Sequence, residues 1–400
     1  MGIVCSNFAI AQNETDVLRY SFLNYSGTSR FVGAGGALGA LGADLTAISI
    51  NPAGMGKYSR GDFGFTTNLI SNKVDALYNG SDASDNRVNF NISNIGGVFS
   101  VPVTNGSQWR RLQFGYTYNR TNNFQSNTLI TGKHDNSQLD VFADYAQGIA
   151  PEDLYNGPEA FDAGLAYDAY LMSYDSATGN YRPWYATTDI TQTASIQRRG
   201  AQYSSDILFS GNYQDKILVG GSIGFPSIRY KERSNYTESF GSDTTIYDTE
   251  EYTYSRSLET RGSGFNMKLG LIIMPDPAVR IGLAVHSPTW YSMSDRYSSS
   301  ISSSFEDASF NQTDIESPEG FYEYALTTPA RFIGDFGVLI SKRAFISAEY
   351  EYVNYAGAKL RNGVNSTDNY SFNAENTAVK ENYQNASNIR LGAEFRVTNH

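Results

Sequence analysis

The chain has 400 residues and a formal net charge of −11, with 14% aromatic but only 18% charged side chains. The negative charge excludes a general nucleic-acid binder, because that role needs a basic surface. One cysteine and three histidines exclude a disulfide framework and leave little for a zinc site, so we expect no metal and no cofactor. The many Tyr, Phe and Gly residues favour strands, tight turns and aromatic girdles over helices.

The first eleven residues, MGIVCSNFAIA, carry no charge. Ala9 and Ala11 fit the small-x-small pattern of a signal-peptidase site, which would start the mature chain at Gln12. The usual basic stretch ahead of the apolar residues is missing. We therefore interpret residues 1–11 as the remnant of a signal peptide, with a lipid anchor on Cys5 as the weaker alternative.

Residues 12–60 do not alternate as strands do. Residues 29–51 are rich in Gly and Ala and are followed by Pro52. Small side chains allow close packing inside a narrow lumen, and glycine allows unusual backbone angles. The glycines do not form a phosphate-binding loop, because Leu38 stands where the last glycine of such a motif belongs and no Gly-Lys-Ser follows. We predict that residues 12–60 form a plug.

From residue 61 onward, apolar side chains alternate with polar or small ones. In residues 111–119, for example, the apolar set is Leu112, Phe114, Tyr116 and Tyr118. Such alternation predicts strands with two chemically different faces. It gives about ten strands, at residues 61–77, 86–103, 109–132, 199–213, 216–240, 252–274, 279–305, 318–340, 343–361 and 386–399.

The connections between these strands are of two kinds. Short turns are predicted at 104–106, 214–215, 275–277 and 341–342. Long polar connections are predicted at 133–198, 232–251, 305–317 and 362–385. Short turns at one end and long loops at the other are typical of an outer-membrane β-barrel, although a soluble sandwich also alternates.

The connection 133–198 is long enough to have a structure of its own. Residues 138–149 and 161–174 could form helices, so we predict a partly helical, extracellular cap. The barrel would comprise residues 61–400. The last strand ends near His400, where a turn should begin, and we expect the barrel to be truncated there.

Several segments together resemble a known family. The similarity rests on residues 33–53, above all on Asn51, Pro52 and Ala53 just before the first strand. Residues 286–289, 328–331 and 349–352 agree with it. On these segments the chain resembles the FadL family of outer-membrane transporters for fatty acids and aromatic hydrocarbons, in particular members from Bacteroidetes-type bacteria.

The resemblance implies a fold and a mechanism. It implies that Asn51, Pro52 and Ala53 belong to a hatch inside the lumen of a transmembrane, antiparallel up-and-down β-barrel. It also implies fourteen strands in the whole barrel, of which about ten would be present. We predict an all-β fold of this kind, located in the bacterial outer membrane.

If the apolar sets face lipid, the alternate positions face the lumen. One interpretation is structural, with interior charges pairing between strands and with the plug. The other is functional, with a cation binding the acidic head of a ligand. The candidate ligand-contacting residues are Lys268, Arg280, His286 and Arg390. Other charged positions assigned to the lumen are Asp335, Glu349, Glu351, Glu394 and Arg396.

We therefore predict a channel that takes up hydrophobic small molecules by passive diffusion past the hatch, and not an enzyme. The expected partners are a fatty-acid-like ligand and outer-membrane lipid, with the protein a monomer. A general porin and a barrel whose loops serve adhesion are the alternatives. The transported compound stays open among fatty acids, aromatic hydrocarbons, terpenoids and heme.

Overall fold

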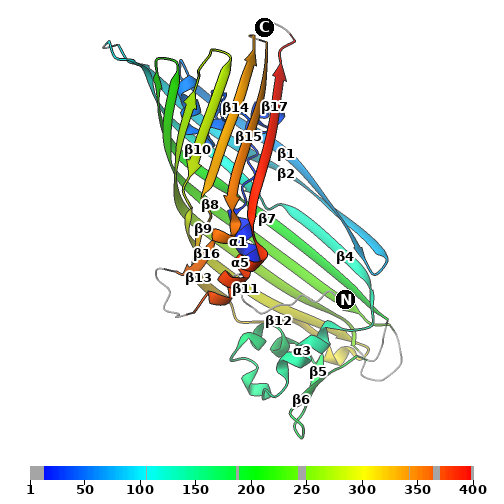
Figure 1. Cartoon of the computed structure of the whole chain (residues 1–400). Coiled ribbons are helices and arrows are strands. Elements are labelled where there is room, and N and C mark those ends of the chain that lie inside the picture. The colour runs from blue at the N-terminus through cyan, green and yellow to red at the C-terminus, as the bar shows by residue number, and fades with distance from the viewer. Residues whose placement is uncertain are drawn as a thin grey trace.

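The computed structural model describes residues 13–104, 106–185, 189–241, 249–341, 343–363 and 370–397, and the predicted signal-peptide remnant lies outside them. The chain is mostly β, and fifteen of its strands form one large, curled antiparallel sheet (Figure 1). Ten strands follow one another across the sheet: β1 (Asp62–Tyr78), β2 (Ser81–Pro102), β3 (Trp109–Asn123), β7 (Ile190–Tyr213), β8 (Ile217–Ser239), β9 (Thr249–Ile273), β10 (Val279–His286), β14 (Arg331–Ile340), β15 (Ala344–Asn354) and β17 (Asn385–Phe395).

Five further strands join the same sheet. Four of them are short: β4 (Ser126–His134), which pairs with β7, and β12 (Gln312–Glu316), β13 (Gly320–Thr327) and β16 (Lys359–Asn362). The fifth, β11 (Trp290–Phe305), is long and continues the sheet beside β9 beyond the end of β10. Strands β1 and β17 form the two edges, and within the described residues they do not pair with each other. The sheet is therefore a half-barrel with a concave and a convex face (Figure 1).

Several predicted strand bounds were wrong. The predicted strands 279–305 and 318–340 are each split in two, because residues 287–289 and 328–330 interrupt the sheet. Each break contains a proline, which lacks the backbone N–H that the ladder requires. Strand 109–132 is likewise split near Gln125, between β3 and β4.

Two further strand bounds differ from the prediction, because strand residues with polar side chains were predicted as loops. β7 begins at Ile190, within the predicted cap. β1 and β2 meet at a two-residue turn, Asn79-Gly80, whose φ angles of 46° and 82° are positive as a type I′ hairpin turn requires. The tight turn therefore lies at the end of the sheet where long loops were predicted.

The two faces of the sheet differ sharply in chemistry. On the convex face, the outward positions 217–225 of β8, 265–273 of β9 and 279–285 of β10 carry no charge, and most of their large apolar side chains are exposed. On the concave face, polar and charged side chains are buried. This is the alternation that the sequence predicted.

Aromatic side chains border the apolar convex face at two levels. Near the short turns, Trp109 and Tyr213 lie with ring centroids 5.4 Å apart. At the other level is a row that we call the loop-side aromatic row, formed by Tyr118, Tyr203, Phe225, Phe265 and Trp290. Tyr203 and Tyr213 are ten residues apart on β7, which on a strand tilted by about 40° is a height of roughly 25 Å.

The N-terminal residues 13–60, here called the hatch segment, lie against the concave face. They contain the helices α1 (Glu14–Ser21) and α2 (Ser29–Gly33) and the 3-10 turns η1 (Ala47–Ser49) and η2 (Pro52–Lys57). Most of residues 34–56 are buried. Helix α1 packs beside α5 (Asn373–Asn382), which lies in the connection before β17 (Figure 1).

Residues 138–185, here called the cap, close the concave face at its loop end. The cap contains α3 (Gln138–Ala146), η3 (Pro151–Asp153), η4 (Pro158–Phe161), α4 (Ala163–Asp168) and the hairpin β5 (Met172–Asp175) and β6 (Asn180–Pro183). Both predicted helices are present but shorter. Ser137 begins α3 with a capping box, and Gly148 at φ 78° follows its end.

The remaining short elements are two 3-10 turns, η5 (Ala308–Phe310) before β12 and η6 (Tyr355–Gly357) before β16. Among the helices of the described residues, none is both long and apolar enough to cross a membrane.

Candidate functional site

Asn51 is at the centre of the contact between the hatch segment and the sheet. Its side chain is fully buried, and its Oδ1 accepts a hydrogen bond from the backbone N–H of Ala53 at 3.2 Å. Its Nδ2 donates to the carbonyl of Leu283 at 3.4 Å and to the Asp335 carboxylate at 3.3 Å. Pro52 starts η2 as the first residue of the turn, where no N–H is needed. Asn51 thus caps its own turn and joins it to β10 and β14.

Three glycines of the sheet form a cradle under this turn. A Cβ on Gly270 would lie 2.1 Å from the Oδ1 of Asn51, and one on Gly220 would lie 2.4 Å from the carbonyl carbon of Pro52. A Cβ on Gly282 would lie 3.1 Å from the Nδ2 of Asn51. Gly220 and Gly270 are direct partners on β8 and β9. The turn can lie this close to the large sheet, here called the wall, only because these three positions have no side chain.

Lys268 and His286 hold the two residues just before Asn51. The Lys268 ammonium donates to the Ser49 carbonyl at 3.0 Å and to both oxygens of Asp206 at 3.2 Å. The Nε2 of His286 is 2.7 Å from the carbonyl of Ile50. Both wall side chains are about 95% buried. Consecutive hatch carbonyls are therefore fixed by consecutive wall strands, β9 and β10.

Arg280 and Arg390 are placed differently. Arg280 donates to the Leu41 carbonyl at 2.7 Å, so it too holds the hatch segment. Arg390, on β17, makes ion pairs with Glu349 and Glu351 of β15, at 2.7 Å in the case of Glu351. It contacts other strands and belongs to the wall.

Arg331 extends this charged network back to the hatch segment. It forms an ion pair with Glu351, and its other nitrogen donates to the carbonyl of Ser21 at 2.5 Å. Glu351 thus accepts from two arginines, and the network ends at Asp335 beside Asn51. Sequence reasoning placed the carboxylates in the lumen but did not single out Arg331.

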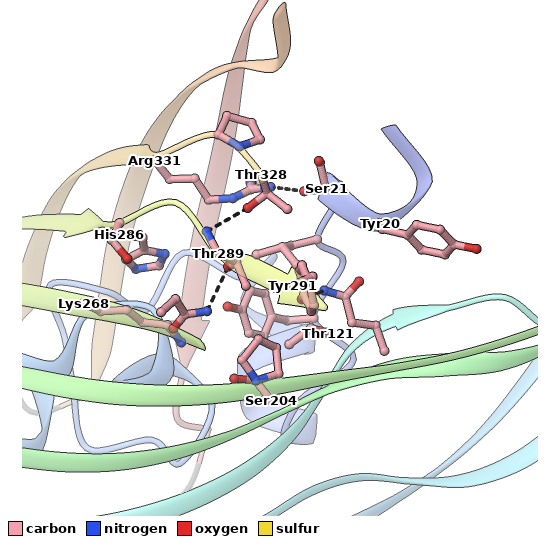
Figure 2. A pocket seen from close by; sticks show the side chains of 17 residues that line it. Tyr20, Ser21, Thr121, Ser204, Lys268, His286, Thr289, Tyr291, Thr328 and Arg331 are labelled. Atoms are coloured by element: carbon pink, nitrogen blue, oxygen red, sulfur yellow. Dashed lines mark hydrogen bonds between the residues drawn. The ribbon is translucent and has the colours of Figure 1, made fainter. Parts of the chain in front are cut away.

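A small cavity lies between the hatch segment and the wall (Figure 2). Wall side chains that include Lys268, His286 and Arg331 line it on one side. The hatch segment lines the other side with Tyr20, Ser21, Leu23 and Tyr25. Its volume, as space open to the centre of a water molecule, is about 30 Å³. That is room for one or two waters, whereas a benzene-sized ligand needs a cavity of roughly 150 Å³.

The lining of the cavity is polar. Several buried side-chain atoms of its lining residues have no hydrogen-bond partner among the described residues, among them Ser21 Oγ, Thr121 Oγ1, Gln202 Oε1 and Asn266 Oδ1. Water is the natural partner for such atoms in a cavity of this size. The cavity also leaves no room for a heme beside His286, whose Nε2 is taken by the hatch segment.

The cavity lies behind the place where the sheet is broken. Residues 225 and 226 of β8 have no partner on β9, and Pro226 lines the cavity. The breaks at 287–289 and 328–330 are adjacent, joined by a bond from the Thr328 N–H to the Thr289 carbonyl at 2.9 Å. Three proline-containing irregularities, one on β8 and two on the far side of β9, therefore lie close together in the wall.

Of the four candidate ligand-contacting residues predicted from the sequence, the structure brings three into contact with the hatch segment. Lys268, Arg280 and His286 all hold the hatch segment, and Arg390 joins them only through the carboxylates next to Asn51. Arg396, also assigned to the lumen, follows the last residue of β17 and its side chain is 64% exposed. The glycine cradle was missed, although glycine at inward positions of three neighbouring strands was a readable signal.

No protein-family model matches the chain, and no curated protein sequence matches it significantly. In structure the chain is similar to the toluene transporter TodX of Pseudomonas putida, with a TM-score of 0.49 and 10% identity over 95% of this chain and 82% of that one. It is also similar to CymD, a monoaromatic hydrocarbon channel, with a TM-score of 0.42 and 12% identity over 93% and 81%. At these values the comparisons report a likeness of fold to transport proteins and nothing finer.

Proposed function

We propose that the chain is a hatch-gated channel of the bacterial outer membrane that takes up hydrophobic small molecules such as fatty acids or aromatic hydrocarbons. The observation that carries the proposal is the seating of the hatch segment. It covers the concave face of the sheet and leaves a cavity of only about 30 Å³ behind the broken part of the wall. A ligand larger than a few waters can pass along the concave face at this level only if the hatch segment moves.

The convex face supports the location in a membrane. An uncharged face about 25 Å tall between two aromatic levels matches the apolar band of outer-membrane barrels. A soluble protein rarely exposes an apolar surface of this extent. The long cap and the short turns then set the orientation, with the cap outside the cell and the turns at residues 214–216 and 274–278 in the periplasm.

In this proposal the candidate ligand-contacting residues can meet a ligand only after the hatch segment has moved. In the closed state Lys268 and His286 are occupied by the carbonyls of Ser49 and Ile50. Movement of the hatch segment removes both carbonyls. Lys268 stays paired with Asp206 but gains a free N–H donor, which can bind an acidic head group. The break at Pro226 and its neighbours gives a released ligand a route through the wall into the lipid.

Uptake into proteoliposomes tests the proposal. We expect the protein to speed the entry of a fluorescent fatty acid but to leave the vesicles impermeable to small sugars. Replacing Lys268 by Met should weaken fatty-acid uptake more than uptake of a neutral hydrocarbon. Rapid swelling in sugars with no gain in hydrophobic uptake would instead identify a general porin.

A further inference from the structure

A group of cations lies on the convex face just beyond the loop-side aromatic row. We call it the basic cluster: Arg229, Lys231, Arg233, Arg261 and Arg296, on the outward positions of β8, β9 and β11. Four carboxylates are near it: Glu259 in its middle, and Glu316, Glu319 and Glu323 at the side of β12 and β13. Five cations against four carboxylates leave a small surplus of positive charge, on a chain whose net charge is −11.

The level of the basic cluster follows from the strands. Arg229 is four residues beyond Phe225 on β8, and Arg261 is four residues before Phe265 on β9. Four residues on a tilted strand rise by about 10 Å. The hydrocarbon core ends near the aromatic row, and the headgroup layer is the next several ångströms. The cluster therefore lies at the level of lipid headgroups.

The pairing within the cluster is unfavourable without an anion. Arg229 and Arg261 are direct partners across β8 and β9, and like charges in such positions repel. Glu259 is shared between Lys231 at 2.7 Å and Arg261 at 2.8 Å. Arg229 and Arg233 have no ion-pair partner within the part of the chain that the structure describes, and both are exposed. Arg229 and Arg233 thus have no carboxylate partner among the described residues, and Arg229 also faces the charge of Arg261, which points to an anionic ligand.

The shape of the surface fits a sugar phosphate. A hollow of about 1110 Å³ is lined largely by outward residues of β8, β9 and β11. Its lining holds Arg233, Arg261 and Arg296 and several serines, together with Glu259, Glu316 and Glu319. This is the size of a ligand site. The planar guanidinium groups suit phosphate oxygens, and the serine hydroxyls suit sugar hydroxyls.

From these observations we propose that the basic cluster binds the phosphorylated glycolipid headgroup of the outer membrane leaflet, as in lipopolysaccharide. The inference rests on the orientation in the proposed function, which places the cluster on the cap side and hence in the outer leaflet. Bound lipid would neutralise the cluster and seal the wall near its break at Pro226.

Binding of lipid A to the full chain in detergent micelles tests the inference. We expect diphosphorylated lipid A to bind at least 10-fold more tightly than the same lipid without phosphates, and more weakly as salt rises. The R229Q/R261Q variant, which keeps side-chain size but removes both charges, should lose at least 10-fold in affinity. The matched control is R110Q, an exposed arginine near the short turns, which should bind as the wild type does.

Each of the following would overturn the inference: equal binding of the dephosphorylated lipid, undiminished binding by R229Q/R261Q, or equal loss in R110Q. Inorganic phosphate that competes at the concentration of the lipid would also do so, since the site would then bind free anions. Uptake is measured with the same purified proteins in proteoliposomes. Failed lipid binding with intact uptake overturns this inference alone, and failed uptake with intact phosphate-selective binding overturns the proposed function alone.

Discussion

The hatch segment and the cap both lie against the concave face of the sheet, but the contacts that hold each of them differ in kind. The hatch segment is joined to the wall through several small apolar clusters and through its backbone carbonyls, which accept from Lys268, His286 and Arg280. The cap is joined through one large apolar core, in which Phe142 packs on Tyr254, and its carbonyls accept from neutral hydroxyls such as that of Ser303.

This difference indicates which part can move. A hydrogen bond to the wall can be replaced by one to water. Each therefore contributes only about 0.5–1.5 kcal/mol net, or about 1.5–3 kcal/mol where the donor is charged. Buried apolar area loses about 25 cal/mol per Å² when it is exposed to water, and nothing replaces it. The hatch segment also buries small apolar clusters, but its centre is polar and glycine-rich. We therefore expect the hatch to be the gate and the cap to be a fixed lid.

The largest effect is expected at the buried ion pair under the hatch segment. Asp206→Ala leaves the Lys268 ammonium buried without its carboxylate and should lower the free energy of unfolding by about 3–5 kcal/mol. Urea unfolding in detergent micelles measures this loss. The double replacement Asp206→Leu with Lys268→Met should recover most of it. A decrease in the free energy of unfolding of less than about 1 kcal/mol would mean that the Lys268–Asp206 ion pair contributes no more than a solvent-exposed ion pair does.

The cap should respond to loss of an aromatic ring instead. Phe142 is 2% exposed, with its ring 5.2 Å from that of Tyr254. Phe142→Ala should destabilise the cap by about 3–5 kcal/mol and open residues 138–185 to proteases. Tyr145→Ala is the control, because Tyr145 lies on the same helix but is exposed. Equal protease resistance of the two variants would contradict an apolar attachment.

A smaller effect is expected from a side chain placed in the glycine cradle. Gly270→Val pushes against Asn51 and should cost about 1–3 kcal/mol, while lifting the turn from the wall and increasing sugar leakage into proteoliposomes. Gly334→Val is the control, because a Cβ on Gly334 would meet nothing within 4 Å. If both variants leak equally, the seating of Asn51 does not close the lumen.

The smallest effect is expected at the rim of the hatch segment. Arg30 and Glu394 form an ion pair at 2.7 Å, but their side chains are 42% and 29% exposed. Arg30→Ala should therefore change stability by no more than about 1 kcal/mol and leave uptake unaltered. Thermal melting and uptake assays check this, and a loss as large as that of Asp206→Ala would remove the distinction between centre and rim.

Local patterns predicted most of the wall and part of the site. Alternation predicted the principal strands and their two faces, and Asn51, Pro52 and Ala53 stood out before any contact was known. The breaks at 287–289 and 328–330 were not predicted, because a proline is tolerated at a strand edge and only the pairing shows which case applies. The Asn79-Gly80 dipeptide is typical of a two-residue hairpin turn, but the turn was not predicted because the residues around it are polar.

The partners of the charged residues could not be predicted. Lys268 and Asp206 are far apart in the sequence and meet only through the register of three strands. The contact of Arg331 with Ser21 depends on where the hatch segment lies, which no local pattern encodes. The pairing register of distant strands therefore determines which charged residues meet in the site, whereas local alternation is enough to predict the strands of the wall.

The most direct test of the account is to lock the hatch segment to the wall. The Oγ of Ser49 and the Oγ1 of Thr117 are 2.9 Å apart and buried, so cysteines at both positions are placed for a disulfide. In a Cys5→Ser background, the oxidised S49C/T117C protein should lose hydrophobic uptake, and a reductant should restore it, with each single variant unaffected. Uptake by the oxidised protein at the rate of the reduced one would show that the hatch segment is not the gate.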